Sequence, residues 1–218
     1  MLAVAGLFGS LVSGLYITSR ETLDRNRVAR RNRAYVEAFR LGNTEEMSPA
    51  EIGQLVEQQI VIREQALPGE QQDGSMTIVE AYENPERTRL KGVGFRFRGS
   101  GFWAPIEGIL ALTPDGRKTL GLFILQQQET PGLGGRIEEQ IFIGEFEAGV
   151  DVSVPEEAAK YLQISQTAPQ AGTAMEGRHV DAITGATQTC MAMERILNNH
   201  LRRFKRVRTA STENEAGE

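Results

Sequence analysis

The N-terminal stretch most constrains what this chain can fold into, because the first charged residue is Arg20. Residues 2–19 are dominated by Leu, Val, Ala, Gly and Phe. In a helix, about 18 residues span about 27 Å, which is close to the hydrocarbon thickness of a bilayer. A secretory signal would begin with basic residues and end in a small-x-small cleavage site, and the stretch shows neither. We expect residues 1–19 to form a single transmembrane anchor, with a buried helix of a soluble fold as the alternative.

Residues 20–47 are rich in Arg and Glu and contain good helix formers, which predicts a helical stalk that continues from the anchor. The positive-inside rule would place the arginines of this segment in the cytoplasm. That rule is a statistical tendency, so the motifs of the remaining chain also bear on the orientation. The arginines are Arg20, Arg25, Arg27, Arg30, Arg31 and Arg33.

Composition excludes several classes of protein. One Cys and two His rule out a disulfide framework and argue against a structural zinc site. A net charge of -5 argues against a general nucleic-acid binder. His179 and His200 are far apart in the sequence, so we expect no metal site and no acid–base catalysis from them.

The remaining pattern predicts one α+β domain over residues 48–207. Ser48 and Glu51 form a capping box that opens a predicted helix over 49–66. A short helix is predicted over 153–162 and a last helix over 186–204, with Met191, Ile196, Leu197 and Leu201 as buried candidates. The polar end of the chain, 208–218, is expected to be a disordered tail.

Short apolar runs with β-branched residues predict antiparallel strands between these helices. The turn Thr113-Pro114-Asp115-Gly116 should join two of them as a hairpin, because Pro, Asp and Gly favour the backbone angles of a tight turn. The predicted strands are 76–82, 90–98, 106–113, 118–126 and 139–146.

The most informative segment runs from Asp181 to Cys190, directly before the last predicted helix. It combines three threonines with one flexible glycine at a helix N-terminus, where free N–H groups and the helix dipole attract phosphate. A Thr hydroxyl there can donate a hydrogen bond or become esterified. The alternative is an ordinary N-cap with no ligand.

The spacing Asp-x-x-Thr-Gly-Ala-Thr-x-Thr in this segment resembles the flavinylation motif of the FMN-binding domain family. That domain occurs in the G subunit of Rnf complexes and in the C subunit of the sodium-pumping NADH:quinone oxidoreductase. The resemblance implies that a flavin transferase joins FMN through its phosphate to Thr187. Thr189 remains the lesser candidate for the acceptor. The motif residues are Asp181, Thr184, Gly185, Ala186, Thr187 and Thr189.

Two further segments resemble the same family. Residues 99–106 match its glycine-aromatic segment, and residues 128–137 match its Glu-Thr-Pro-Gly-Leu-Gly signature. The resemblance covers roughly residues 90–205. Two departures stand out: glutamines occupy 126–128, where the family often has basic residues or His, and Cys190 stands where Ser is more usual. We expect the first to alter polarity near the flavin and Cys190 to be a small buried residue.

The resemblance implies roles for these segments. Glu129 and Thr130 are candidates to hydrogen-bond the isoalloxazine or the ribityl chain, and Trp103 or Leu133 to pack against the ring. Plain core filling is the alternative for Trp103. The glycines let the backbone approach the flavin closely. Those glycines include Gly99, Gly101, Gly132, Gly134 and Gly135.

These expectations describe an electron-transfer subunit with covalent FMN and no catalytic residues of its own. Its partners would be the membrane subunits of an Rnf-type, ferredoxin:NAD ion-translocating complex, and its soluble domain would lie outside the cytoplasmic membrane. The short chain favours the Rnf type over the quinone reductase type. The alternative from another class is a membrane-anchored structural or interaction subunit without redox activity.

Overall fold

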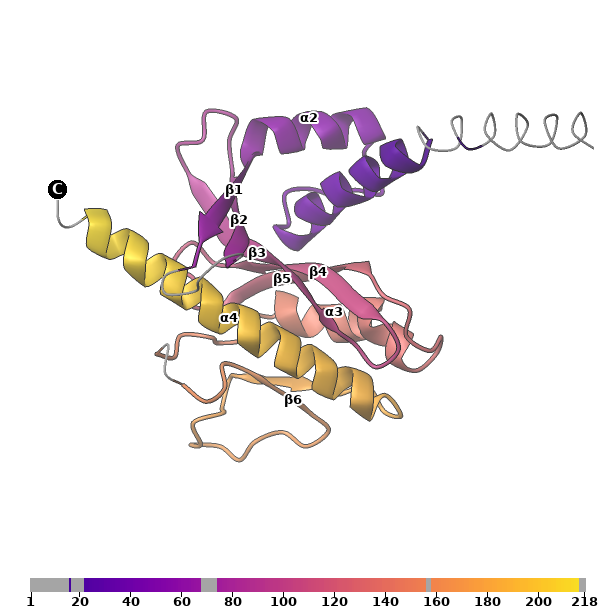
Figure 1. Cartoon of the computed structure of the whole chain (residues 1–218), viewed down its shortest axis with the longest axis vertical. Helices are drawn as coiled ribbons and strands as arrows, with labels where there is room; N and C mark the ends of the chain where they lie inside the picture. The colour runs from indigo at the N-terminus through magenta and orange to yellow at the C-terminus, as the bar shows by residue number, and fades with distance from the viewer. Residues whose placement is uncertain (1–15, 17–21, 68–73, 156–157, 216–218) are drawn as a thin grey trace, which may run out of the picture.

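The computed structural model describes residue 16 and residues 22–67, 74–155 and 158–215 (Figure 1). Apart from Tyr16, the predicted anchor over 1–19 lies outside these residues. Within the described ranges, no helix has the length and apolar character that a membrane crossing requires.

A five-stranded antiparallel sheet forms the centre of the domain, with its strands in chain order. Four of the predicted strands are confirmed, including the hairpin between β4 and β5. In its turn, the Gly116 N–H donates to the Thr113 carbonyl at 2.7 Å, and Gly116 has a φ of 68°. The strands are β1 (Ile60–Ala66), β2 (Ser75–Tyr82), β3 (Leu90–Ser100), β4 (Pro105–Leu112) and β5 (Thr119–Gln126).

The predicted helix over 49–66 is too long, because its second half is strand β1. Helix α2 covers Pro49–Gln59 and begins with the predicted capping box of Ser48 and Glu51. The next residues, Ile60-Val61-Ile62, are β-branched, and they pair with β2 as an edge strand. Pairing with the next strand along the chain therefore outweighs the helical spacing of the apolar residues.

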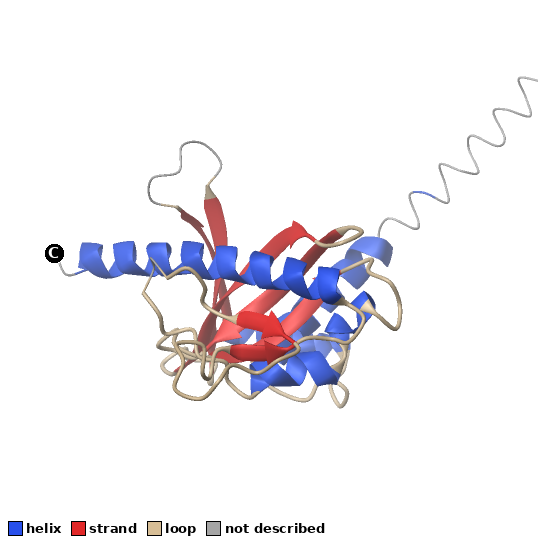
Figure 2. Ribbon diagram, turned by 90° about the horizontal axis from the view of Figure 1, so that it is seen from below, coloured by secondary structure: helices blue, strands red, loops and turns tan. Residues whose placement is uncertain are grey.

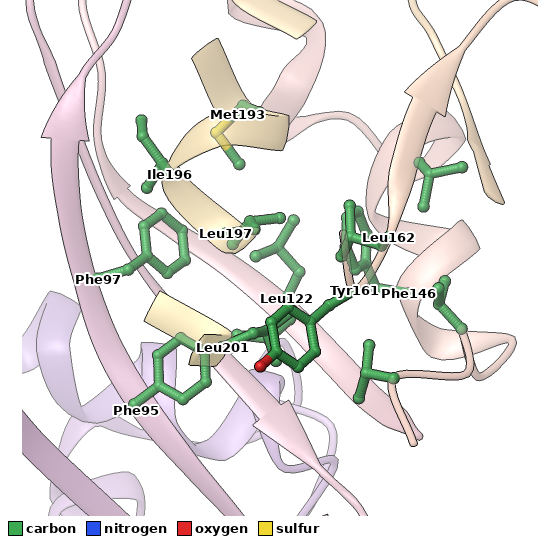
Figure 3. Packing of buried hydrophobic residues seen from close by; sticks show 14 of the residues in the cluster. Phe95, Phe97, Leu122, Phe146, Tyr161, Leu162, Met193, Ile196, Leu197 and Leu201 are labelled. Atoms are coloured by element: carbon green, nitrogen blue, oxygen red, sulfur yellow. The ribbon is translucent and has the colours of Figure 1, made fainter. Parts of the chain in front are cut away.

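Helix α4 (Thr187–Glu215) crosses one face of the sheet (Figure 2). Leu197 and Leu201 of α4 are fully buried against residues such as Phe95 of β3 (Figure 3). Met191 is an exception to the predicted buried set, since it is 58% exposed on the outer side of α4. The helix also continues past Val207 to Glu215, although the sequence predicts a disordered tail from residue 208.

The segment predicted as a strand over 139–146 is a helix. A 3₁₀ turn (Gly134–Glu138) leads into α3 (Gln140–Glu147). Phe142 and Phe146 lie one helical turn apart and are buried, with ring centroids 5.5 Å apart, whereas Ile141 is 66% exposed. A spacing of four residues puts Phe142 and Phe146 on one face of a strand as well as of a helix. The main chain distinguishes the two, because the Ile143 N–H donates to the Glu139 carbonyl and the Ala148 N–H to the Gly144 carbonyl, as in a helix.

The predicted helix over 153–162 does not form, since residues 153–155 and 158–162 are irregular. The side chain of Asn198 in α4 accepts hydrogen bonds from the main-chain N–H groups of Tyr161 and Leu162. These groups therefore bond to α4 instead of to a local helix. The chain then forms a short parallel pair of strands, β6 (Gln163–Ser165) and β7 (His179–Asp181), and β7 leads into the threonine motif.

The outer face of the sheet is covered by the helix over residues 22–38, drawn in indigo in Figure 1. Tyr35 and Phe39 at its C-terminal end are buried against Val79, Ile109 and other residues of the sheet. A Cβ placed on Gly94 would lie 2.9 Å from Phe39 Cζ, so the glycine lets the ring approach the strand. Part of the predicted stalk over 20–47 therefore packs on the sheet and contributes to a second hydrophobic core, which includes Tyr35, Phe39 and Ile109.

Candidate functional site

The buried carboxylate of Glu129 brings the three motif segments together. Its Oε1 accepts hydrogen bonds from the N–H groups of Phe102 at 3.0 Å and Trp103 at 3.1 Å. Its Oε2 accepts from the Thr189 hydroxyl at 2.7 Å. Glu129 is 5% exposed and lies 60 residues from Thr189 in the sequence. The glycine-aromatic loop, the Glu-Thr-Pro-Gly segment and the first turn of α4 therefore form one structural unit.

The turn before α4 presents free donors. The first hydrogen bond within the helix runs from the Cys190 N–H to the Ala186 carbonyl at 2.9 Å. Ala186 is therefore the N-cap, and its methyl side chain offers no acceptor to the first turn. In the described part of the chain, no hydrogen bond joins the Thr184 side chain to this turn either. The N–H groups of residues 187–189 thus remain available for an anion.

The two candidate acceptor threonines differ in their surroundings. Thr187 is the first residue of α4 and is exposed, as is Thr184 in the preceding turn. Thr189 is 4% exposed, and its hydroxyl donates to Glu129. Of the two, only Thr187 offers its hydroxyl to an approaching group without breaking a buried hydrogen bond. Asp181, at the end of β7, is also exposed.

Exposed apolar side chains lie on the segments that Glu129 joins. Trp103 is 67% exposed, and its indole N–H donates to the Thr130 hydroxyl at 3.1 Å. Phe102 is 53% exposed and packs against Trp103 with ring centroids 4.8 Å apart. Leu133, on the neighbouring loop, is 44% exposed. Core filling, the alternative for Trp103, is wrong, because the indole lies at the surface.

Phe102 and Met191 are exposed apolar residues near the candidate site that the sequence analysis does not predict as site residues. Phe102 stands beside Trp103 in the glycine-aromatic segment, and that adjacency was the available signal. Met191 lies one helical turn after Thr187 and is exposed. Its apolar character suggested a buried position, so no pattern in the sequence distinguished it from the core residues of α4.

Glycines allow the loops to close around Glu129. A Cβ on Gly101 would lie 2.6 Å from Glu129 Oε1, and one on Gly134 would meet the Thr189 hydroxyl and the Glu129 side chain. Gly132 has a φ of 73° and no neighbour within 4 Å of such a Cβ, so its role is conformational. The glycines at 101 and 134 therefore approach a protein carboxylate.

Gly185, in the turn before α4, combines a positive φ with a close neighbour, so a substitution there tests the turn. It has a φ of 80°, and a Cβ there would lie 3.1 Å from Leu133 Cδ2. We expect Gly185→Ala to lower the free energy of unfolding by more than the roughly 1–2 kcal/mol that a left-handed conformation costs a residue with a side chain. Gly172→Ala is the matched control, since its φ is 81° with no neighbour within 4 Å. Equal losses in urea titrations would show that Leu133 does not constrain the turn.

Cys190 is a buried residue of the helix start, as expected. It is 2% exposed, the Ile183 N–H donates to its Sγ at 3.4 Å, and burial raises the pKa of the thiol. Because the thiolate is the reactive form, we expect a thiol reagent at pH 8 to modify native protein at least about 100-fold more slowly than unfolded protein. Comparable rates in the two states would contradict this placement.

The two histidines lie apart and serve the fold. His200 Nε2 accepts from the Arg98 N–H at 3.4 Å, its ring stacks on Phe95, and burial lowers its pKa. His179 Nε2 lies 2.9 Å from the Ser165 carbonyl across the β6–β7 pair. Within the described ranges, no group of three or more His, Cys, Asp or Glu residues is arranged to hold a metal ion.

A cavity of about 630 Å³ lies elsewhere, between the helix over 22–38, β5 and α3. Its lining includes Arg30, Glu37 and Ile143, and none of the predicted site residues contributes to it. The candidate site is instead the exposed surface around Thr187, Trp103 and Leu133.

Comparison with known proteins shows what this part of the chain resembles. Residues 101–202 match the model of the FMN-binding domain family, and this range contains the Glu-Thr-Pro-Gly segment, the threonine motif and residues 101–106 of the glycine-aromatic segment. The chain is also homologous to the C subunits of Na⁺-translocating NADH-quinone reductases. It is 26% identical to that of Chlamydia trachomatis over 144 residues, which cover 62% of this chain and 45% of the relative. It is 31% identical to the C subunit of Pasteurella multocida over 94 residues, which cover 43% of this chain and 34% of the relative.

Two solved structures share the fold. The C subunit from Parabacteroides distasonis superimposes with a TM-score of 0.67 at 20% identity, covering 86% of this chain and 96% of the other. NqrC from Shewanella oneidensis superimposes with a TM-score of 0.64 at 16% identity, covering 86% of this chain and 98% of the other. The chain spans about half the length or less of the curated relatives it matches.

Proposed function

We propose that this chain is an electron-transfer subunit that carries FMN covalently, through a phosphoester on Thr187. The observation that carries the proposal is the contrast between two hydroxyls of one motif. Thr187 is exposed at the start of α4, whereas Thr189 is buried and bonded to Glu129. An exposed hydroxyl beside free N–H groups suits a phosphate monoester.

The residues around Thr187 fit the two parts of FMN. The N–H groups of the first turn and the positive end of the helix dipole would hold the phosphate. The exposed faces of Trp103 and Leu133 would cover the planar ring, with Trp103 oriented by its bond to Thr130. The bound flavin supplies the redox chemistry, while the chain sets its position and its access to partners.

We infer that the subunit acts within a membrane complex that couples electron transfer to ion translocation, with its FMN-binding domain on the extracytoplasmic side. The names of the relatives reported above favour a quinone reductase-type complex. The Rnf type expected from the sequence is the alternative. Affinity purification from native membranes distinguishes the two, since the partner subunits differ.

A denaturing gel tests the redox proposal. The chain is purified from its native host, boiled in detergent and inspected under ultraviolet light before staining. We expect a fluorescent band at the position of the chain, because a phosphoester survives these conditions. A dark band from protein made in its native host would contradict the proposal and favour a structural or interaction subunit.

A further inference from the structure

Glu129 holds a place in the site that direct contact with a ligand does not explain. Both of its carboxylate oxygens accept hydrogen bonds from the protein, and the side chain is 5% exposed. A carboxylate has about four acceptor positions, and three of them receive donors here. Its donors come from the aromatic loop and from the first turn of α4.

The next residue, Thr130, accepts a further hydrogen bond from the glycine-aromatic loop that carries Phe102 and Trp103. The Trp103 main chain donates to Glu129 and the Trp103 indole donates to Thr130. Trp103 is 67% exposed and packs against Phe102, which is itself 53% exposed, so the buried core does little to fix the direction of the indole. These two hydrogen bonds therefore orient an aromatic side chain that the core does not hold.

The backbone around the carboxylate is shaped to admit it. A Cβ on Gly101 would lie 2.6 Å from Glu129 Oε1, and one on Gly134 would lie 3.2 Å from Glu129 Oε2. Any side chain at these positions would push the carboxylate away from its donors. The close approach of both loops thus depends on the Glu129 carboxylate as well as on the glycines.

We propose that Glu129 is a positioning residue that fixes Trp103 and the first turn of α4 in one arrangement before flavin is attached, with Thr189 as its contact on the helix. This inference rests on the proposed function, in which Thr187 on the same turn receives the flavin. In this arrangement, the Thr189 hydroxyl belongs to the support of the site and is not available for esterification.

Three variants separate the effect of Glu129 on the orientation of Trp103 and α4 from its effect on the stability of the fold. Glu129→Ala removes all three acceptor contacts. Glu129→Gln keeps two of them, because the amide oxygen accepts from both N–H groups, and replaces the third by a hydrogen bond of the opposite direction, from the amide nitrogen to the Thr189 hydroxyl. Asn198→Ala is the matched control, since Asn198 is 7% exposed and also joins α4 to a distant segment, at Tyr161 and Leu162.

Trp103 is the only tryptophan, so its fluorescence anisotropy in flavin-free full-length protein reports its mobility. The second readout is the initial rate of covalent flavin attachment by the transferase, measured well below every variant's melting temperature. For Glu129→Ala we expect lower anisotropy and attachment at least about 10-fold slower, because three hydrogen bonds that hold the site are lost and about 1.4 kcal/mol corresponds to tenfold in rate. Glu129→Gln and Asn198→Ala should stay within about twofold of wild type, although Asn198→Ala should melt at a lower temperature.

Wild-type anisotropy or a wild-type attachment rate in Glu129→Ala would overturn the inference. So would an equal loss of both in Asn198→Ala, because the effect would then follow stability alone. If wild-type protein accepts no flavin at all, the proposed function fails, and the anisotropy measurements still decide whether Glu129 positions Trp103.

Discussion

Replacing Thr187 by Val should abolish covalent flavin while leaving the fold intact. Valine has nearly the shape of threonine but no hydroxyl, and position 187 is exposed, so the change removes the ester acceptor with little effect on packing. We expect gel fluorescence per mole of protein to fall at least about 100-fold, because nucleophilic attachment has no alternative oxygen at that position. Thr187→Ser should retain measurable fluorescence.

Two neighbouring threonines provide the controls. Thr184→Val changes an exposed residue of the same turn and should keep most of the fluorescence. Thr189→Val removes a buried donor to Glu129, so it should slow attachment without moving the flavin to another residue. Persistent fluorescence in Thr187→Val, together with complete loss in Thr189→Val, would show that Thr189 is the acceptor.

Phe39→Ala should be among the most destabilising substitutions in the chain, although Phe39 falls in the predicted stalk. The side chain is fully buried and lies against Gly94 of β3. Truncating a buried Phe removes its apolar contacts and leaves a cavity, which costs about 3–5 kcal/mol. Urea unfolding of the full chain in detergent, followed by circular dichroism, measures this loss.

Val28 provides a matched control on the same helix. It is 46% exposed, so Val28→Ala should change the free energy of unfolding by less than about 0.5 kcal/mol. Similar small losses for both substitutions would mean that the helix over 22–38 contributes little to the core, as a simple stalk would.

The sequence predicts the central sheet well because its strands carry strong local signals. Residues 90–126 combine β-branched runs with a Thr-Pro-Asp-Gly turn, and β3, β4 and β5 lie close to the predicted bounds. The errors occur where local patterns are ambiguous. The run over 139–146 is short enough to suit a strand or a helix, and the four-residue spacing of Phe142 and Phe146 puts both on one side of either element.

In the candidate site too, the sequence predicts some features and not others. The threonine motif, the glycine-aromatic loop and the Glu-Thr-Pro-Gly segment are recognisable in the sequence, and the structure brings them together. The contact that joins them, between Glu129 and Thr189, spans 60 residues and leaves no periodic pattern. The exposure of Met191 was equally hidden, because it depends on how α4 is rotated against the sheet.

Mass spectrometry of one tryptic peptide tests the central claim most directly. Cleavage after Arg178 and Arg195 releases residues 179–195, which contain three threonines: Thr184, Thr187 and Thr189. For mature protein from its native membrane, fragmentation should place an FMN phosphoester on Thr187. An FMN adduct on Thr189 or Thr184, or an unmodified peptide at full occupancy, would contradict the account.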